Sequence, residues 1–414
     1  MTQARTVLVV SYHYPPAATP GSRRAATLAI ELAARGWNVV VLTATPDAAA
    51  GPRTGGLTVV RTTPRRGRAG SGEIARPLAS RIPLLKLITG FPDRYAPWGA
   101  ALGAVLPRLV REYRVDVVLS SSPPHSSQFA IAVTRSFRRF PWVADFRDPW
   151  TCPHRRGLSW PSGPIQRHME RFVVRRCDRV LANTPGNRAA LLAAMPELSG
   201  AGAGKVDVVT NGFDDAMLAA PAAGSAQREG ADLTYVGEVY PGMLETYCRA
   251  LALIREEGGM ALPRLAIYGH VSSSERRLVT AAGLDAQFDY RGVVDHEESV
   301  EAMRAARRLL VLLPRGDGWR SCVPSKVYWY LAARRPIVAI VPAGDTSALV
   351  RETGAGWALD DDNPARVAAR LREILNPARS EEEPMATGVE RFAMSAIVGH
   401  VERILCEVSR GSAS

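Results

Sequence analysis

The stretch PSKVYWYLAARRPIVAIVP, residues 324–342, decides the fold of this chain. It reads as a loop that opens a short helix, followed by a turn and the apolar run 336–342. A short apolar run without polar alternation is typical of a strand that is covered on both faces, as in a parallel sheet. The stretch therefore predicts a helix that leads into a buried strand.

The same order of strand and helix repeats on both sides of this stretch. In the first half we predict strands at 6–12, 37–44, 115–122, 141–146, 178–184 and 205–212, with helices at 26–36, 127–137 and 185–195. In the second half we predict strands at 231–239, 264–269, 288–294, 307–314, 336–342 and 356–360, with helices at 244–258, 296–307 and 363–375. Residues 216–231 are rich in Ala, Gly and Pro, as a linker would be. The pattern predicts two α/β domains with parallel sheets and a boundary near 212–231.

The composition agrees with a globular protein of two domains. The 414 residues exceed what one core usually covers, and 46% apolar with 22% charged residues is ordinary. No apolar run reaches the roughly 18 residues of a membrane span, and the N-terminal run reads as a first strand rather than a signal peptide. The five cysteines (152, 177, 248, 322 and 406) show no metal or disulfide spacing, so we expect a reducing cytoplasm.

The net charge of +12 arises from 52 Lys and Arg against 40 Asp and Glu. Arginines are frequent and acids few between Arg61 and Arg114. This region is either a solvated basic face or a surface for an anionic membrane or a phosphorylated acceptor. Known nucleic-acid modules are absent from the sequence, so nucleic-acid binding is not expected.

Candidate site residues follow the strands, because ligands of open parallel sheets bind beyond the carboxyl ends of the strands. After the first strand, YHYPPAATPGSRRAA (12–26) is a Gly/Pro loop that runs into a helix. Gly21, Arg23 and Arg24 could meet an anion at that helix start, and a plain strand-to-helix turn is the alternative.

Two further loops of the first half carry polar side chains. His125 follows the strand at 115–122 and precedes a helix, so it is either a structural or a functional histidine. In ADFRDPW (144–150), Asp145 and Asp148 flank Arg147. The two carboxylates could bind acceptor hydroxyls or act as a base, and the arginine could hold phosphate. An Asp–Arg network that stabilises the turn is the alternative.

In the second half, VGEVYPG (236–242) and YGHVSS (268–273) both end strands with glycine, so Gly237 can bring backbone amides near a ligand. The polar loop 313–326 leads into the helix of the opening stretch. Arg320, Ser325 and Lys326 converge near that helix start and form a plausible anion site. HEES (296–299) lacks the second His of a zinc motif and reads as a helix start, and no cluster has metal-ligand spacing.

Together these segments resemble retaining glycosyltransferases of GT-B fold, in the group-1 (family 4) set, and most of all the branch that makes exopolysaccharides and decorates natural products. The resemblance covers nearly the whole chain. It is carried by SYHYPPAATPGSRRA near the start, PDRYAPW (92–98), SSPPHSS (121–127), WVADFRDPW (142–150), NGFD (211–214), YVGEVY (235–240) and PSKVYWYLAARRPIVAI (324–340).

The resemblance implies two Rossmann-like domains that face each other across a cleft. The acceptor-binding domain would span 1–212, the nucleotide-sugar domain 213–386, and residues 387–414 would hold a helix that crosses back to the first domain. An enzyme of this kind is cytoplasmic, either free or associated with a membrane through 61–114. It moves a sugar from a nucleotide-diphosphate sugar to a small-molecule, glycan or lipid-linked acceptor, with no cofactor and no metal.

The resemblance also implies roles for single residues. The Gly21 loop would approach the donor phosphates. Where many members of the family have a His-Asp pair, this chain has Arg147 and Asp148, so the Asp is retained and the His is replaced by Arg. His125 would partly take the role of the missing His. Gly237, Arg23, Arg24, Arg320, Ser325 and Lys326 would surround the donor. The family's usual Arg and two Glu positions hold Glu238, Ser321 and Trp329 here.

These three departures leave two readings open. In the first, the donor binds in an altered way, with cations from other positions and with Trp329 stacking on a ring. In the second, the chain is a catalytically altered GT-B protein: a pseudo-glycosyltransferase, a partner subunit or a nucleotide-sugar epimerase.

Overall fold

A computed structural model describes residues 4–17, 19–44, 56–62, 92–148, 150–151, 162–198, 200–219, 231–376 and 383–411. Most of the basic region 61–114, most of the linker 216–231 and Cys152 lie outside the described residues. The chain divides into two compact units. Unit 1 comprises Met1–Asn183, Asn187–Thr210 and Ile397–Ser414, and unit 2 comprises Thr184–Gly186 and Asn211–Ala396.

Within its described residues, unit 1 has a parallel sheet of seven strands in the order β3-β2-β1-β4-β5-β6-β7. The strands are β1 (Thr6–Ser11), β2 (Asn38–Thr43), β3 (Leu57–Arg61), β4 (Val117–Ser122), β5 (Trp142–Phe146), β6 (Arg179–Ala182) and β7 (Val206–Val208). The helices are α1 (Pro20–Ala34), α3 (Ala96–Glu112), α4 (His125–Phe137), α5 (Ser162–Arg176), α6 (Pro185–Ala194) and α14 (Met394–Arg410), with 3-10 turns at Pro196–Leu198 and Gly200–Lys205.

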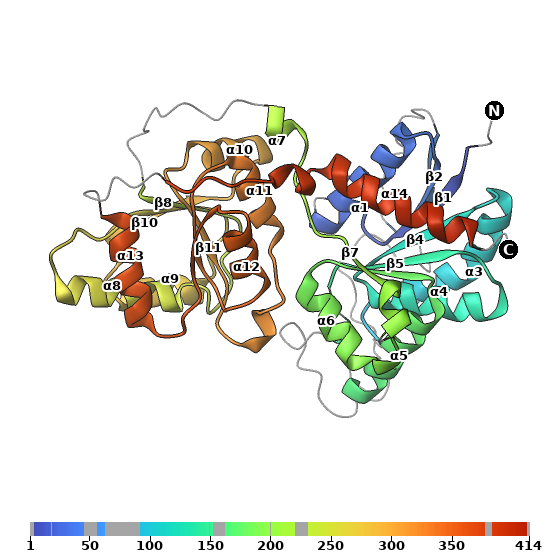
Figure 1. The fold of residues 1–414 in the computed structure, drawn as a ribbon, viewed down its shortest axis with the longest axis horizontal. Helices are drawn as coiled ribbons and strands as arrows, with labels where there is room; N and C mark the ends of the chain where they lie inside the picture. Colours follow the sequence, from blue (N-terminus) through green and yellow to red (C-terminus); the bar gives the residue numbers. More distant parts are fainter. Residues whose placement is uncertain are drawn as a thin grey trace, which may run out of the picture. The chain divides into compact units, whose positions relative to one another are not determined.

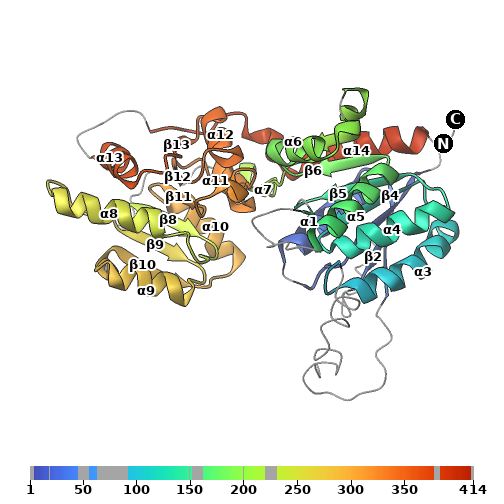
Figure 2. The same ribbon diagram turned by 90° about the horizontal axis from the view of Figure 1, so that it is seen from below.

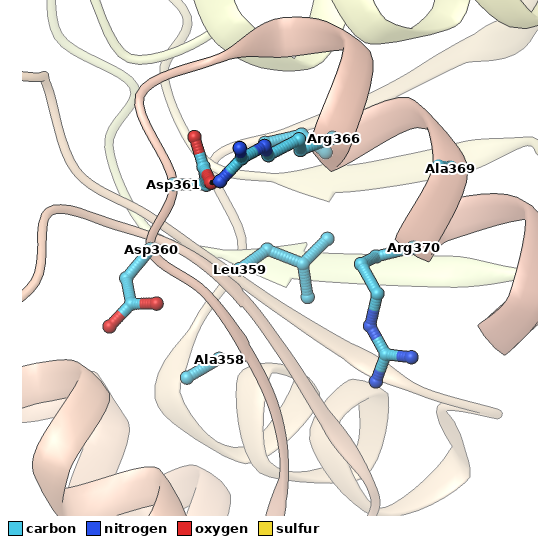
Figure 3. A pocket seen from close by; sticks show the side chains of 8 residues that line it. Ala358, Leu359, Asp360, Asp361, Arg366, Ala369 and Arg370 are labelled. Atoms are coloured by element: carbon cyan, nitrogen blue, oxygen red, sulfur yellow. Dashed lines mark hydrogen bonds and ion pairs between the residues drawn. The ribbon is translucent and has the colours of Figure 1, made fainter.

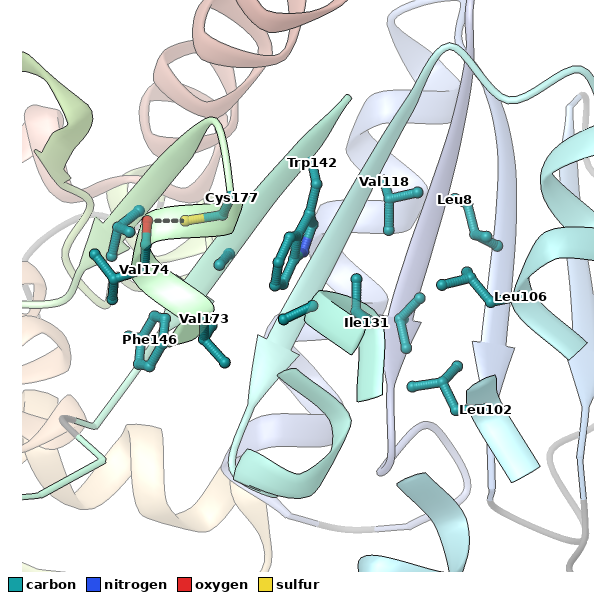
Figure 4. Packing of buried hydrophobic residues seen from close by; sticks show 14 of the residues in the cluster. Leu8, Leu102, Leu106, Val118, Ile131, Trp142, Phe146, Val173, Val174 and Cys177 are labelled. Atoms are coloured by element: carbon teal, nitrogen blue, oxygen red, sulfur yellow. Dashed lines mark hydrogen bonds between the residues drawn. The ribbon is translucent and has the colours of Figure 1, made fainter. Parts of the chain in front are cut away.

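Helices cover both faces of this sheet, which explains the uninterrupted apolar runs of its strands. On one face Leu8, Val118 and Trp142 pack against side chains of α3, α4 and α5, among them Leu102 and Ile131 (Figure 4). The alternate residues of the same strands point to the other face, where α1 and α14 lie side by side (Figure 1).

Helix α14 is tied to unit 1 by side chains from its second half. Glu402 accepts a hydrogen bond from the Trp37 indole nitrogen (2.9 Å) and pairs with Arg35 (3.3 Å). Glu407 pairs with Arg179 (2.6 Å). Residues 397–410 of α14 therefore complete the first unit. The sequence expectation placed a helix within 387–409; in the structure a 3-10 turn at Val389–Phe392 precedes α14.

Unit 2 has a parallel sheet of six described strands in the order β10-β9-β8-β11-β12-β13. The strands are β8 (Leu233–Val236), β9 (Leu265–Tyr268), β10 (Phe288–Gly292), β11 (Leu309–Leu312), β12 (Ile337–Ile340) and β13 (Gly356–Leu359). The helices are α7 (Ala216–Ala219), α8 (Glu245–Glu257), α9 (Ser273–Ala281), α10 (His296–Ala305), α11 (Ser325–Ala333), α12 (Asp345–Glu352) and α13 (Pro364–Leu375), with 3-10 turns at Asp285–Gln287 and Asp317–Trp319.

Helices cover both faces of the second sheet (Figure 2), and a separate core lies on each face. Val311 and Ala339 face α10, α11 and α12, whereas their neighbours Leu310 and Val338 face α8, α9 and α13. The opening stretch takes part in both cores, since α11 packs on one face and β12 is buried between them. The predicted helix and buried strand at 324–342 are confirmed.

The two sheets share one topology, and it locates their ligand edges. In each sheet the order runs outward in both directions from a central strand pair, β1 and β4 in unit 1 and β8 and β11 in unit 2. In sheets of this order, ligands bind beyond the carboxyl ends of the central pair. The segments of interest are therefore those that follow β1, β4, β8 and β11.

The predicted α/β architecture with two Rossmann-like units is confirmed, and several boundaries differ. Helix α1 begins at Pro20 and not at residue 26, because the Thr19 hydroxyl accepts the Ser22 amide (3.2 Å) and caps it. The helix expected at 127–137 begins at His125. Helices α3 and α5 and strand β3 were not predicted, and no ranges were given for helices α7, α9 and α12.

Candidate functional site

In unit 1, an aromatic cluster follows the first central strand. The Tyr12 ring lies 4.4 Å from that of Tyr95 and 4.8 Å from the imidazole of His13, between ring centroids. Arg94 lies over the Tyr95 ring (4.9 Å) and donates to its hydroxyl (2.6 Å). Burial lowers the pKa of His13, and the positive charges of Arg147 and Arg94 lower it further. His13 is therefore a neutral imidazole that lies beside cations. Its unprotonated ring nitrogen can accept a hydrogen bond from a hydroxyl.

Gly21 lies against the Arg147 side chain. A Cβ atom at this position would lie 2.1 Å from Nη1 of Arg147, the end of a flexible side chain that a larger residue would displace. The structure thus brings two sequence candidates, Gly21 and Arg147, together. Asp148 lies beside Arg147, partly buried in the turn after β5, and Arg23 is exposed on α1.

Arg24 and Asp145 form a buried ion pair, with 3.1 Å between Nε and Oδ2. Arg24 is 7% exposed and Asp145 1%. The guanidinium also donates to the Thr210 carbonyl (2.9 Å), and Asp145 accepts from the Ser121 hydroxyl (3.3 Å). The alternative considered from the sequence was a network of Asp145 with Arg147 inside the turn; the ion-pair partner of Asp145 is instead Arg24 from α1. Both side chains are thus engaged in tying α1, β4 and β5 together.

His125 is 2% exposed and lies in the first turn of α4. Its ring stacks on Trp150, with 5.1 Å between centroids and 8° between planes, and lies 6.3 Å from that of Phe146. The start of α4 is capped from α3's side, since Asp93 accepts the Ser126 amide (3.0 Å). The geometry of His125 is that of a packed core ring.

In unit 2, two glycine turns meet beyond β8 and β9. Gly237 has φ +123° and Gly269 has φ +148°, values that favour glycine. A Cβ on Gly269 would lie 2.1 Å from the Gly237 carbonyl oxygen, and the Gly237 amide donates to the Tyr268 carbonyl (2.7 Å). The two turns expected from VGEV and YGHV therefore lie backbone to backbone.

Lys326 reaches these turns from the first turn of α11. A Cβ on Gly237 would lie 2.6 Å from Nζ of Lys326, and the ammonium lies 3.8 Å from the centroid of the Tyr235 ring, to whose hydroxyl it donates. Burial lowers the pKa of Lys326 to about 7, and the charge of Glu238 opposes the shift. An amine with this pKa gains a proton readily when an anion arrives.

Two buried tyrosines, missed by the sequence analysis, hold this arrangement. Tyr330, from α11, accepts the Val236 amide through its hydroxyl (2.8 Å), which joins the helix to the end of β8. The Tyr235 hydroxyl donates to the Glu238 carbonyl (2.9 Å), and burial raises its pKa well above the usual value. Their signal in the sequence was a tyrosine within an otherwise apolar strand or helix, which needs a hydrogen-bond partner when buried.

The remaining donor-side candidates lie around the same edge. Ser325 and Glu238 are exposed, and Trp329 is partly exposed. Arg320 is 55% exposed at its side chain and pairs with Asp317 (2.7 Å). Thus Gly237, Lys326 and Glu238 are brought together.

A hollow of about 330 Å³ lies elsewhere in unit 2, beside β13 and the start of α13 (Figure 3). Its acids are paired, Asp360 with Arg351 (2.6 Å) and Asp361 with Arg366 (2.8 Å). None of the candidate residues lines it. Because β13 is an edge strand, away from the central pair, we do not place the functional site there.

The residues that the structure describes contain no group of three or more His, Cys, Asp and Glu side chains placed to hold a metal ion. Within the same ranges, no helix is both long enough and apolar enough to cross a membrane.

Two units, one built on a parallel sheet of seven described strands and the other on a parallel sheet of six, define a protein of GT-B fold. Residues 21–212 match the family model described as a Glycosyl transferase 4-like domain. A search of curated proteins gave no match.

Solved structures show the same fold at low identity. Sucrose-phosphate synthase from Thermosynechococcus elongatus is 18% identical, with a TM-score of 0.63 over 99% of this chain and 100% of that one. Anabaena Alr3699/HepE, in complex with UDP and glucose, is 15% identical, with a TM-score of 0.61 over 97% and 99%. The apo form of WaaB, a lipopolysaccharide outer core galactosyltransferase, is 12% identical, with a TM-score of 0.63 over 97% and 99%.

Proposed function

We propose that the chain is a glycosyltransferase that moves a sugar from a nucleotide-sugar donor to a hydroxyl acceptor, with retention of the anomeric configuration and without a metal ion. The observation that carries the proposal is the Lys326 ammonium held over the Gly237 turn beyond β8. An amine and backbone at the central edge of such a sheet suit a diphosphate. The family match to 21–212 and the similar proteins that bind UDP support the same reading.

In this proposal unit 2 holds the donor and unit 1 holds the acceptor. Lys326 neutralises the negative charge that develops on the departing diphosphate. This is electrostatic stabilisation of the leaving group, and it requires no covalent bond to the protein. In unit 1, neutral His13 accepts a hydrogen bond from the acceptor hydroxyl, and Arg147 and Arg94 favour an acceptor with a negative group. Asp148 keeps the role of a catalytic carboxylate beside Arg147.

The first experiment is a thermal-shift titration with UDP, GDP and their sugars. A ligand at 100 times its dissociation constant stabilises the unit that binds it by about 2.7 kcal/mol. Asp148→Asn should abolish transfer and leave nucleotide binding nearly unchanged, since it lies in unit 1. Full activity of this variant would remove Asp148 from the mechanism.

The alternative, a catalytically altered GT-B protein, predicts other results. Consumption of a nucleotide sugar without any acceptor would indicate an epimerase. Activity that arises only after a second transferase is added would indicate a partner subunit. Glu238, Ser321 and Trp329 are the residues that keep this alternative open.

A further inference from the structure

Exposed apolar side chains gather on two neighbouring helices of unit 1, α4 and α5. Phe137, the last residue of α4, is 85% exposed, and Val133, one turn earlier, is 37% exposed. Residues four positions apart lie on one face of a helix, so the two side chains leave α4 on the same side. Isolated exposed apolar side chains are ordinary, whereas neighbouring ones indicate an interaction site.

Helix α5 continues this apolar face. The two helices lie side by side (Figure 2), and the ring of Phe172 in α5 lies 5.5 Å from that of Phe129, between centroids. Phe129 lies one turn before Val133, and both phenylalanine rings are partly exposed. The guanidinium of Arg176 lies 3.6 Å from the centroid of the Phe172 ring and donates to the Ser136 hydroxyl (2.8 Å). Apolar side chains of both helices therefore belong to one surface, with a cation held against it.

This surface is positively charged. Helix α4 contains no acidic residue, and the one acidic residue of α5, Glu170, is 3% exposed. Arg138 and Arg139 follow Phe137 directly, and both are exposed. The described ion pairs of these helices involve two other arginines: Arg135 with Asp178 (2.6 Å) and Arg175 with Glu197 (2.9 Å).

An exposed aromatic ring beside arginines suits an anionic lipid surface. The ring enters the boundary of the acyl chains, while the long arginine side chains keep their guanidinium groups at the level of the lipid phosphates. A symmetric dimer through this surface would bring arginines against arginines. Because Phe137 is 85% exposed, it projects from its helix and does not line a groove such as a bound helical peptide requires.

We propose that unit 1 binds the surface of a bilayer that contains anionic phospholipids. The contact is the α4–α5 surface, formed by Val133, Phe137, Phe172, Arg138, Arg139 and Arg176. Helix α4 runs from the carboxyl ends of the strands back to their amino ends, so Phe137 and the two arginines after it lie away from the segments that follow β1 and β4. The surface is thus an anchor separate from the candidate site, and the inference does not rest on the proposed function.

Flotation of the full chain with vesicles of phosphatidylcholine and about one third phosphatidylglycerol tests this. The chain should bind these vesicles and leave them as NaCl is raised to about 1 M, where the Debye length is about 3 Å. Arg138→Gln with Arg139→Gln should lower the partition coefficient by about 25-fold, since each arginine near an anionic surface contributes about fivefold. Phe137→Ala should lower it by about tenfold, because an apolar side chain no longer leaves water.

Two matched controls remove the same kinds of side chain elsewhere. Ile30→Ala changes an apolar residue of α1 that is 55% exposed, and Arg264→Gln with Arg277→Gln removes two exposed arginines of unit 2. Both controls should change the partition coefficient by less than about twofold, because charges beyond the Debye length are screened.

Several results would overturn the inference. The first is a lack of binding to the anionic vesicles, or equal binding to vesicles of phosphatidylcholine alone. The second is unchanged binding in the α4 variants, or an equal loss in the controls, since either would place the contact elsewhere in the chain. Binding of polyglutamate without binding of the vesicles would instead assign the surface to an acidic protein.

Discussion

Nucleoside diphosphate binding should weaken as the pH rises from 7 to 9, because Lys326 loses its proton in this range. Its pKa of about 7 means that half of the free protein carries the charge at pH 7 and about one part in a hundred at pH 9. A bound diphosphate holds the proton on the amine. The affinity should therefore fall by up to about 50-fold, or about 2.3 kcal/mol.

Calorimetry at pH 7, 8 and 9, in two buffers of different ionisation enthalpy, measures both the affinity and the proton uptake. Uptake should rise from about 0.5 proton at pH 7 to about 0.9 at pH 8. The terminal phosphate, with a pKa of about 6, is already ionised in this window. Lys326→Arg is the control: its charge persists, so its affinity should be flat with pH. A flat profile in the natural protein would refute the reasoning.

The same pKa shift links the stability of the unliganded protein to pH. Because the pKa of Lys326 is lowered in the folded state from 10.5 to about 7, the unfolded chain binds more protons between these values. The free energy of unfolding should therefore gain a positive contribution from this lysine as the pH rises from 7 to 10.5. Lys326→Met should remove that contribution in denaturant titrations, while Tyr235 keeps its bond to the Glu238 carbonyl. An unchanged slope would contradict the assigned environment.

Three further predictions concern the frame around the site. Asp145→Asn should lower the free energy of unfolding by about 3 kcal/mol, because it leaves the Arg24 charge buried without its partner; a loss below 1 kcal/mol in chemical denaturation would contradict this. Gly269→Ala should lower the free energy of unfolding by more than the matched control Gly36→Ala. Gly36 also has a positive φ, but a Cβ there would meet no atom within 4 Å, so the control should lose about 1 kcal/mol. Equal losses in the two variants would refute the close approach of the Gly237 and Gly269 turns. Val401→Asp, at a fully buried position of α14, should destabilise unit 1 by about 3 kcal/mol or more, and calorimetry should show the transition of unit 1 falling and that of unit 2 unchanged.

The strands were predictable because the parallel sheets bury both of their faces. Residues 337–341 and 7–10 are continuous apolar runs, and β12 and β1 are built around them. Helix α3 was missed although Trp98, Leu102, Leu106 and Leu109 recur at helical spacing. Gly99, Gly103 and Pro107 read as helix breakers, but tertiary packing outweighs their propensity. At Gly99 the reason is visible, since a Cβ there would lie 2.9 Å from the Ser126 carbonyl of α4.

The site was predictable only where one segment carries it. Lys326 follows a polar loop and opens a helix, and both features are local. The partnership of Arg24 with Asp145 joins residues 121 positions apart, so a single sequence cannot reveal that the two charges are buried together. His13 was overlooked beside the glycine and arginines of its loop, and its pKa is lowered first by burial and then by Arg147 and Arg94 from other elements.

The most direct test of the account is a calorimetric titration of the full chain with UDP, GDP and dTDP at pH 7. The dissociation constants of the natural protein are compared with those of Lys326→Met. The account predicts that at least one of these diphosphates binds the natural protein and that the substitution weakens it by tenfold or more, because it removes the ammonium from the end of β8. Absence of binding at millimolar concentrations, or equal binding by Lys326→Met, would contradict a donor site at the Gly237 turn.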